Sequence, residues 1–266
     1  MIEKRDIPKE VHAFHEAFMK LYGGGYKHDV SQLFSDFLNV SISNFQLEPN
    51  PELEAEINKR YSPEEVVLLG KLFQQWVLSM NEIMGEGDGF DWYDILGVYY
   101  EALNHGFKRS AFGQFFTPET IVKMMGAMMF PASDNPDKIQ SISDPCSGSG
   151  RFLLEAHCQL KARCICYGED IDAMCAKMTV LNCLVHGVEA EVIHHNSLMP
   201  ESFNAGWYVN AGIKKGGMPN IRRITAEDSR VIGMWKRVRE EQPEKQKEQV
   251  KILEEKYSNR QLNMFS

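Results

Sequence analysis

The chain has 266 residues, a net charge of −8 and 43% hydrophobic residues, which suits a globular protein with one α/β domain and a smaller companion. No apolar run approaches the roughly 18 residues of a membrane helix, and the charged start of the chain predicts no secretory signal. We therefore expect a cytoplasmic protein. Residues 211–266 carry 13 Lys and Arg against 8 Asp and Glu, so contacts with a phosphate backbone are expected there first.

All six cysteines lie between Cys146 and Cys183. Their irregular spacing in a chain without a secretory signal favours buried, reduced thiols over disulfides or metal ligands. The sequence therefore predicts no metal site.

Residues 1–110 are predicted to form a helical domain. Apolar residues recur at helical spacing from Val11 onward, and the clearest helix begins at Ser62. There an N-cap serine, Pro63 at the first helical position and Glu65 at the third form a capping box. The aromatic and methionine stripes that follow are typical of a helical core rather than of a cofactor site.

Residues 111–213 are predicted to form an α/β domain. Thr117 is a natural N-cap followed by proline, so a helix is expected from Thr120 to about Phe130. Phe116 stands just before it and would either staple the helix to its domain or wall a pocket.

The stretch 143–150, Ser-Asp-Pro-Cys-Ser-Gly-Ser-Gly, predicts the end of a strand, a glycine-rich turn and the start of a helix. Gly148 and Gly150 allow the backbone to turn sharply and to approach a ligand closely. Asp144 at the strand end would repel a phosphate and attract an ammonium group. A ligand with a cationic methionine end, such as S-adenosylmethionine, therefore suits this turn better than a pyrophosphate.

Two more polar side chains follow predicted strands. Asp170 ends a second strand that starts at Arg163, and it lies 20 positions after Gly150, where an acid can bind the ribose hydroxyls of an adenosine. Asn196 follows a third strand at 189–193, at the sheet edge where an adenine would lie.

The alternation of predicted strands and helices becomes less clear beyond a fourth predicted strand at 206–209. Residues 214–266 are predicted to form a basic loop over 214–223, a charged helical arm from about 226 to 257, and a C-terminal peptide. The basic loop would be either a solvated turn or a phosphate clamp.

Together these residues resemble the adenine-specific (N6) DNA methyltransferases, specifically the modification subunit of type I restriction systems. The resemblance rests on the stretches 94–101, 114–118 and 144–150, and it covers roughly residues 60–200. It implies a Rossmann-like S-adenosylmethionine-dependent methyltransferase core, here incomplete, preceded by a helical N-terminal domain. The implied partner is DNA, contacted through partner subunits.

The resemblance also implies a set of residues that bind S-adenosylmethionine. One group would enclose the methionine end of the cofactor: Phe116, Thr117, Pro118, Asp144, Pro145, Gly148 and Gly150. Asp170 would bind the ribose, and Ile171 and Asn196 would bind the adenine.

The catalytic motif of that family, Asn/Asp-Pro-Pro-Tyr/Phe, reads Asn210-Ala211-Gly212-Ile213 at the corresponding position. The resemblance assigns Asn210 to the amino group of a flipped adenine, whereas the stacking aromatic ring is missing. One hypothesis is a DNA adenine-N6 methyltransferase. The alternative is a catalytically inactive pseudo-methyltransferase that acts as a cofactor-binding scaffold or regulator.

The last residues resemble the short peptides with which bacterial replication and repair proteins dock on the sliding clamp. Their anchors here would be Gln261, Leu262, Met264 and Phe265. The other interpretation is a disordered chain end.

Overall fold

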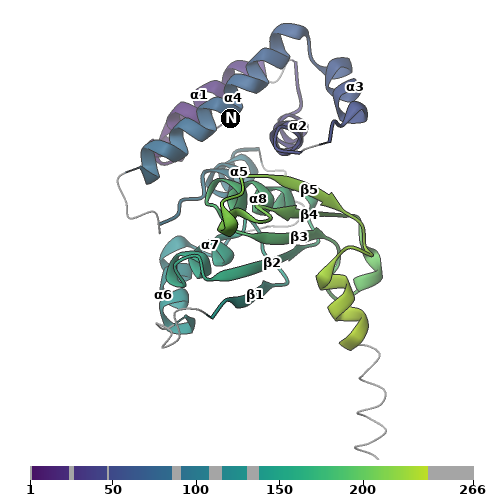
Figure 1. Ribbon diagram of the computed structural model, residues 1–266. Helices are drawn as coiled ribbons and strands as arrows, with labels where there is room; N and C mark the ends of the chain where they lie inside the picture. Colours follow the sequence, from purple (N-terminus) through teal and green to yellow (C-terminus); the bar gives the residue numbers. More distant parts are fainter. Residues whose placement is uncertain are drawn as a thin grey trace, which may run out of the picture.

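The computed structural model describes residues 2–23, 27–46, 48–85, 91–107, 116–130 and 138–238. The first helices gather into one layer above the sheet (Figure 1). Their bounds are α1 (His12–Tyr22), α2 (Val30–Ser43), α3 (Pro51–Arg60), α4 (Pro63–Met84) and α5 (Ile95–Phe107). The peptide at 260–266 and its clamp anchors lie outside the described residues, as does the boundary expected at residue 110.

Capping groups fix where these helices begin. The Ser62 side chain accepts a hydrogen bond from the Glu65 N–H, and Glu65 accepts one from the Ser62 N–H, so the predicted capping box is confirmed. Asp29 caps α2 in the same way by accepting from two backbone N–H groups. Helix α3, which the sequence analysis did not predict, begins at Pro51 after the N-cap Asn50. Only Ile57 of this helix is buried, so the helix lacks the row of apolar residues that would have indicated it in the sequence.

Aromatic rings fill the core of the helical layer. Tyr99 of α5 is fully buried and meets Phe14 and Phe18 at ring-centroid distances of 5.1 and 5.2 Å. Its hydroxyl lies 2.9 Å from His15 Nδ1. The predicted core role of these aromatic residues is confirmed. The same hydrophobic core continues without interruption into the α/β part.

The α/β part follows with α6 (Glu119–Met129), β1 (Gln140–Asp144), α7 (Arg151–Gln159), β2 (Cys164–Asp170), α8 (Ala173–Val185), β3 (Ala190–His194), β4 (Ala205–Val209) and β5 (Ile221–Ile224). The predicted α/β class with a helical region before it is therefore confirmed. Among the described residues, no helix is long and apolar enough to cross a membrane.

The five strands form one mixed sheet in the order β1-β2-β3-β4-β5. The first three are parallel, since α7 and α8 return the chain between them, and all three end at the same sheet edge. Strands β4 and β5 are antiparallel to their neighbours. β5 contains Arg222 and Arg223, which the sequence analysis placed in a loop. The strand was missed because only its two end residues are buried, which leaves no apolar pattern along it.

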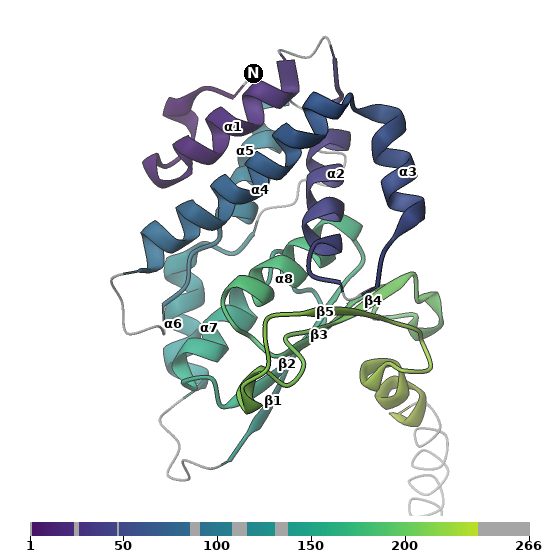
Figure 2. The ribbon, with the colours of Figure 1, turned by 45° about the horizontal axis from the view of Figure 1, so that its top comes forward.

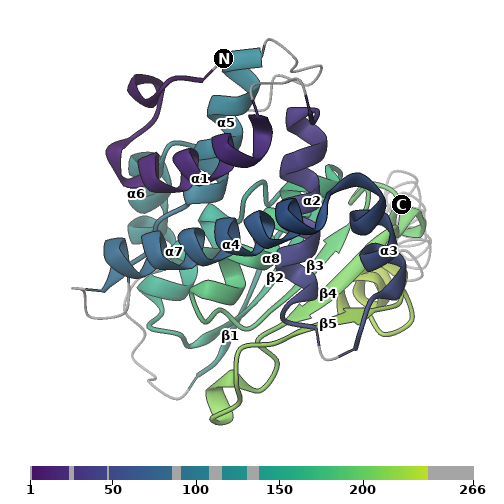
Figure 3. The ribbon, with the colours of Figure 1, turned by 90° about the horizontal axis from the view of Figure 1, so that it is seen from above.

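Helices lie on both faces of the sheet. Figure 2 shows α7 and α8 together along one face, and Figure 3 shows α4 running across the helical layer above them. On the other face, residues 230–238 form a helix whose Val231 and Ile232 pack against Ile193 of β3. Its Trp235 donates a hydrogen bond to the buried Glu169 at 3.0 Å. The part of the predicted charged arm beyond residue 238 lies outside the described residues.

Candidate cofactor site

A glycine turn joins β1 to α7 as predicted. Gly148 and Gly150 have φ values of +57° and +90°, in the left-handed region that favours glycine. A Cβ at Gly148 would lie 2.9 Å from the ring of Phe116. The turn is held from α8, where the Thr179 hydroxyl donates to the Gly148 carbonyl at 2.9 Å. The backbone is therefore fixed in a close turn beneath Phe116.

Two carboxylates flank this turn. Asp144 accepts a hydrogen bond from the Cys146 N–H at 3.1 Å, and Asp170 accepts from the Gly148 N–H at 2.8 Å. Burial is the main cause that raises the pKa of both carboxyl groups. Neither carboxylate has an ion pair with a described cation. The site therefore carries negative charge in a partly buried setting, which suits a cationic ligand.

Phe116 and Thr117 form a lid that is attached from two sides. The Phe116 N–H donates to Glu101 of α5 at 3.0 Å, and Arg151 Nη1 donates to the Thr117 carbonyl at 3.0 Å. The Arg151 guanidinium also lies 5.3 Å from the centre of the Phe116 ring. The lid is thus tied to both the helical layer and the first turn of α7.

Arg151 is in turn held by acids of the helical layer. Its Nε donates to Asp94 at 2.7 Å and its Nη2 donates to Glu101 at 2.9 Å. Asp94 also accepts from Asn182 Nδ2 at 2.8 Å and from the Ser149 hydroxyl. This buried cluster joins α5, α7 and α8 at the back of the glycine turn.

A cavity of about 420 Å³ lies between the turn and the lid, within the size range of small-molecule sites. Its lining combines the turn and strand end with the apolar side of α6: Phe116, Thr117, Val122, Met125, Met129, Ser143, Asp144, Cys146, Ser147, Gly148, Ser149, Arg151 and Phe152. The structure thus brings together four of the predicted cofactor residues, namely Phe116, Thr117, Asp144 and Gly148.

The other predicted residues stand around this cavity rather than in its wall. Asp170 bonds to the glycine turn, and Gly150 forms the last residue before α7. Pro118 and Pro145 are exposed. Ile171 is 67% exposed beyond the end of β2. Asn196 caps its own loop by accepting from the Leu198 N–H at 3.0 Å.

Asn210, the predicted catalytic residue, does not line this cavity. Because β4 is antiparallel to β3, Val209 lies beside Ala190 at the start of β3, whereas Asp170 lies beside His194 at its end. Asn210 therefore occupies the opposite edge of the sheet. It is fully buried there and donates to the carbonyls of Cys183, Leu184 and Val188 at 3.0–3.1 Å.

Sequence reasoning missed the roles of Asp94, Glu101 and Arg151. Asp94 and Glu101 lie in the stretch that carried the resemblance, seven positions apart, and this stretch was the available signal. Their common partner, Arg151, directly follows the glycine turn. The sequence gives no sign that these distant residues meet.

The fold and site define a class of protein: an α/β protein with a cofactor-type glycine turn at the carboxyl edge of its parallel strands. Comparison with known proteins narrows this class. Residues 91–215 match the model of the N-6 DNA methylase family. The matched segment is a little under half of the chain.

Curated relatives are type I methylase subunits. The chain is 23% identical to the "Type I restriction enzyme StySPI methylase subunit" of Salmonella potsdam over 151 residues, which are 45% of this chain and 27% of that protein. It is 24% identical to the EcoKI methylase subunit of Escherichia coli over 42% of this chain and 25% of that protein. The chain thus spans about a quarter of the length of the curated relatives it matches.

Among solved structures, the type I restriction-modification methyltransferase subunit of Streptococcus thermophilus is 17% identical, with a TM-score of 0.34. The similarity covers 67% of this chain and 56% of that one.

Proposed function

We propose that this chain supplies the S-adenosylmethionine-binding part of an adenine-N6 DNA methyltransferase of the restriction-modification kind. The observation that carries the proposal is the cavity in which Asp144, the glycine turn and the Phe116–Thr117 lid meet. The family match over 91–215 supports the same function. When bound, the cofactor would supply an activated methyl group.

The residues around the cavity fit this cofactor chemically. Asp144 is a partly buried carboxylate without a described cation beside it, and S-adenosylmethionine has a cationic methionine end. Phe116, Met125 and Met129 provide apolar contact for the methionine chain and its sulfur. Asp170 remains the proposed ribose ligand, with Ile171 and Asn196 proposed at the adenine, and Pro118, Pro145 and Gly150 shaping the backbone around them.

Isothermal titration calorimetry with S-adenosylmethionine and S-adenosylhomocysteine tests the proposal. We expect binding by the full chain and a loss of about tenfold or more in the Asp170→Asn variant, which keeps one acceptor oxygen for the Gly148 N–H. The exposed Glu227→Ala variant is the matched control. Absence of binding by the unmodified chain, or equal affinity of both variants, would refute the proposal.

We infer that the groups holding the target adenine lie outside the described residues of this chain. Asn210 lies at the wrong edge of the sheet, and the printed sequence contains no Pro-Pro pair. The cavity also borders an exposed apolar face of α6, where Ile121, Met124, Met125, Met128 and Met129 are 38% to 75% exposed. An exposed apolar face of this kind is typical of an interaction surface.

A methyl-transfer assay with labelled S-adenosylmethionine and mixed DNA tests this second point. We expect cofactor binding but no transfer above background by this chain alone. Transfer by the purified chain would show that it holds its own catalytic groups.

A further inference from the structure

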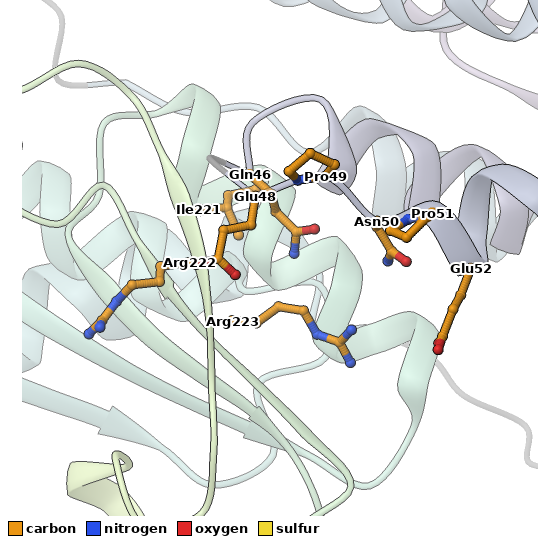
Figure 4. A pocket seen from close by; sticks show the side chains of 9 residues that line it. All are labelled: Gln46, Glu48, Pro49, Asn50, Pro51, Glu52, Ile221, Arg222 and Arg223. Carbon is orange, nitrogen blue, oxygen red and sulfur yellow. The ribbon is translucent and has the colours of Figure 1, made fainter.

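A groove separate from the cofactor cavity lies between α3 and strand β5; we refer to it as the α3–β5 groove. It comprises two neighbouring cavities of about 270 and 320 Å³ that share Gln46, Asn50, Glu52 and Arg223. Figure 4 shows Arg223 extending from β5 toward the side of Glu52, while Arg222, which also lines the smaller cavity, extends in the other direction. The groove shares no lining residue with the cavity beside the glycine turn.

Basic side chains line the larger cavity. Lys177 of α8, His194 at the end of β3 and Arg223 of β5 come together there from three separate elements. Within the described residues, neither Lys177 nor Arg223 has a recorded hydrogen bond or ion pair. Burial lowers the pKa of Lys177, and the more distant carboxylates of Asp36 and Asp172 only partly offset this. A cation held this way costs folding free energy, which an anionic ligand would offset.

The nearby acids are mostly engaged by other donors. Asp36 accepts from Arg60 at 2.9 Å, and Arg60 also bonds to Glu56 at 3.3 Å. Asp172 caps α8 by accepting from two backbone N–H groups. Glu48 and Glu52 also lie in the walls, and they would accept from hydroxyl or amino groups of a ligand. Lys177 and Arg223 are therefore available to an anion.

We propose that the α3–β5 groove binds a phosphate group, carried by a free nucleotide or by a DNA backbone, with Lys177 and Arg223 as its ligands. Arginine presents several N–H donors that match phosphate oxygens, and lysine adds a compact positive charge. The amide side chains of Asn39, Gln46 and Asn50 supply both donors and acceptors to the rest of the ligand. This binding site goes beyond cofactor binding and does not depend on it.

The test uses the full chain and three probes at matched ionic strength: inorganic phosphate, adenosine 5′-monophosphate and a 20-base-pair DNA duplex. Calorimetry gives affinity, and a thermal melt without probe gives stability. We compare Lys177→Met and Arg223→Gln with Lys71→Met, a control at an exposed lysine on α4.

We expect at least one probe to bind the unmodified chain, with affinity reduced about tenfold or more by Lys177→Met and by Arg223→Gln but not by the control. Lys177→Met should also raise the melting temperature, because it removes a partly buried cation that has no ion pair among the described residues. Binding of the duplex alone assigns the phosphate to DNA, whereas binding of the nucleotide assigns it to a small ligand. The proposal fails if no probe binds better than chloride, or if Lys177→Met lowers the melting temperature and leaves binding intact.

Discussion

Arg151 Nε donates to Asp94 Oδ2 at 2.7 Å, a contact between residues 57 positions apart in the chain. Asp94 stands just before α5 of the helical layer, and Arg151 is the first residue of α7 after the glycine turn. Because Arg151 also bonds to the Thr117 carbonyl, this pair connects the helical layer to the lid of the candidate cofactor site. The helical layer thus helps to shape the site as well as to cover the sheet.

The first prediction concerns Arg151 itself. Arg151→Met should lower the free energy of unfolding by about 3–5 kcal/mol, because it leaves the buried Asp94 without its cation. It should also weaken S-adenosylmethionine binding by releasing Thr117. Arg151→Lys should not restore the lid, since an ammonium cannot make the three bonds in the same geometry. Chemical denaturation and calorimetry measure the two effects, with the exposed Lys215→Met as control; unchanged affinity in a folded Arg151→Met protein would contradict the prediction.

A second prediction separates Asn210 from the site. Asn210→Ala removes three hydrogen bonds at the end of α8 and puts alanine at a φ of +55°, so we expect a loss of about 1–3 kcal/mol in the free energy of unfolding. The affinity for S-adenosylmethionine should stay the same. The exposed Asn204→Ala should change neither quantity. A large loss of cofactor affinity at unchanged stability would return Asn210 to the site.

The third prediction is a pH dependence. Burial raises the pKa of Asp144 above its ordinary value of 3.8, so the folded state binds more protons than the unfolded state as the pH rises through that window. The free energy of unfolding therefore falls as the pH rises, and at pH 7 the charged Asp144 destabilises the fold. Asp144→Asn should raise the melting temperature at pH 7, by less toward pH 4, and should weaken S-adenosylmethionine binding.

Asp228 provides a control, because its pKa is shifted in the opposite direction from that of Asp144. Hydrogen bonds from Thr225 lower the pKa of Asp228, so its contribution to stability is present above its ordinary pKa and is lost as the pH falls. Asp228→Asn should lower the melting temperature slightly at pH 7. Melting curves between pH 4 and pH 8 distinguish the two variants; equal signs would contradict the assignment.

The fourth prediction compares two glycines that both have a left-handed backbone conformation. Gly148 and Gly212 both have positive φ, but only a Cβ at Gly148 would meet the Phe116 ring, whereas nothing lies within 4 Å of one at Gly212. Alanine at either position should cost about 1–2 kcal/mol. Only Gly148→Ala should also reduce the affinity for S-adenosylmethionine, as measured by calorimetry. Equal affinities would show that Phe116 does not act as a lid.

Local signals made much of this molecule predictable. The capping box of Ser62 and Glu65, the glycine turn at 148–150 and the ends of β1 and β2 are defined by hydrogen bonds or steric limits within a few residues. Four of the predicted cofactor residues therefore lie around one cavity. β5 was not predicted because Arg222 and Arg223 remain exposed in the middle of the strand, so it lacks a continuous apolar pattern.

The sequence by itself determined the helical layer apart from α3, the strands β1 to β3 and the turn between β1 and α7, because each depends on residues close together in the chain. Only the tertiary structure decided the direction of β4, because strand residues offer the same backbone groups to a parallel or an antiparallel neighbour. That choice places Asn210 at the far edge of the sheet, away from the cofactor cavity. The bond between Asp94 and Arg151 likewise appears only when the packing of α5 against α7 and α8 brings the two residues together.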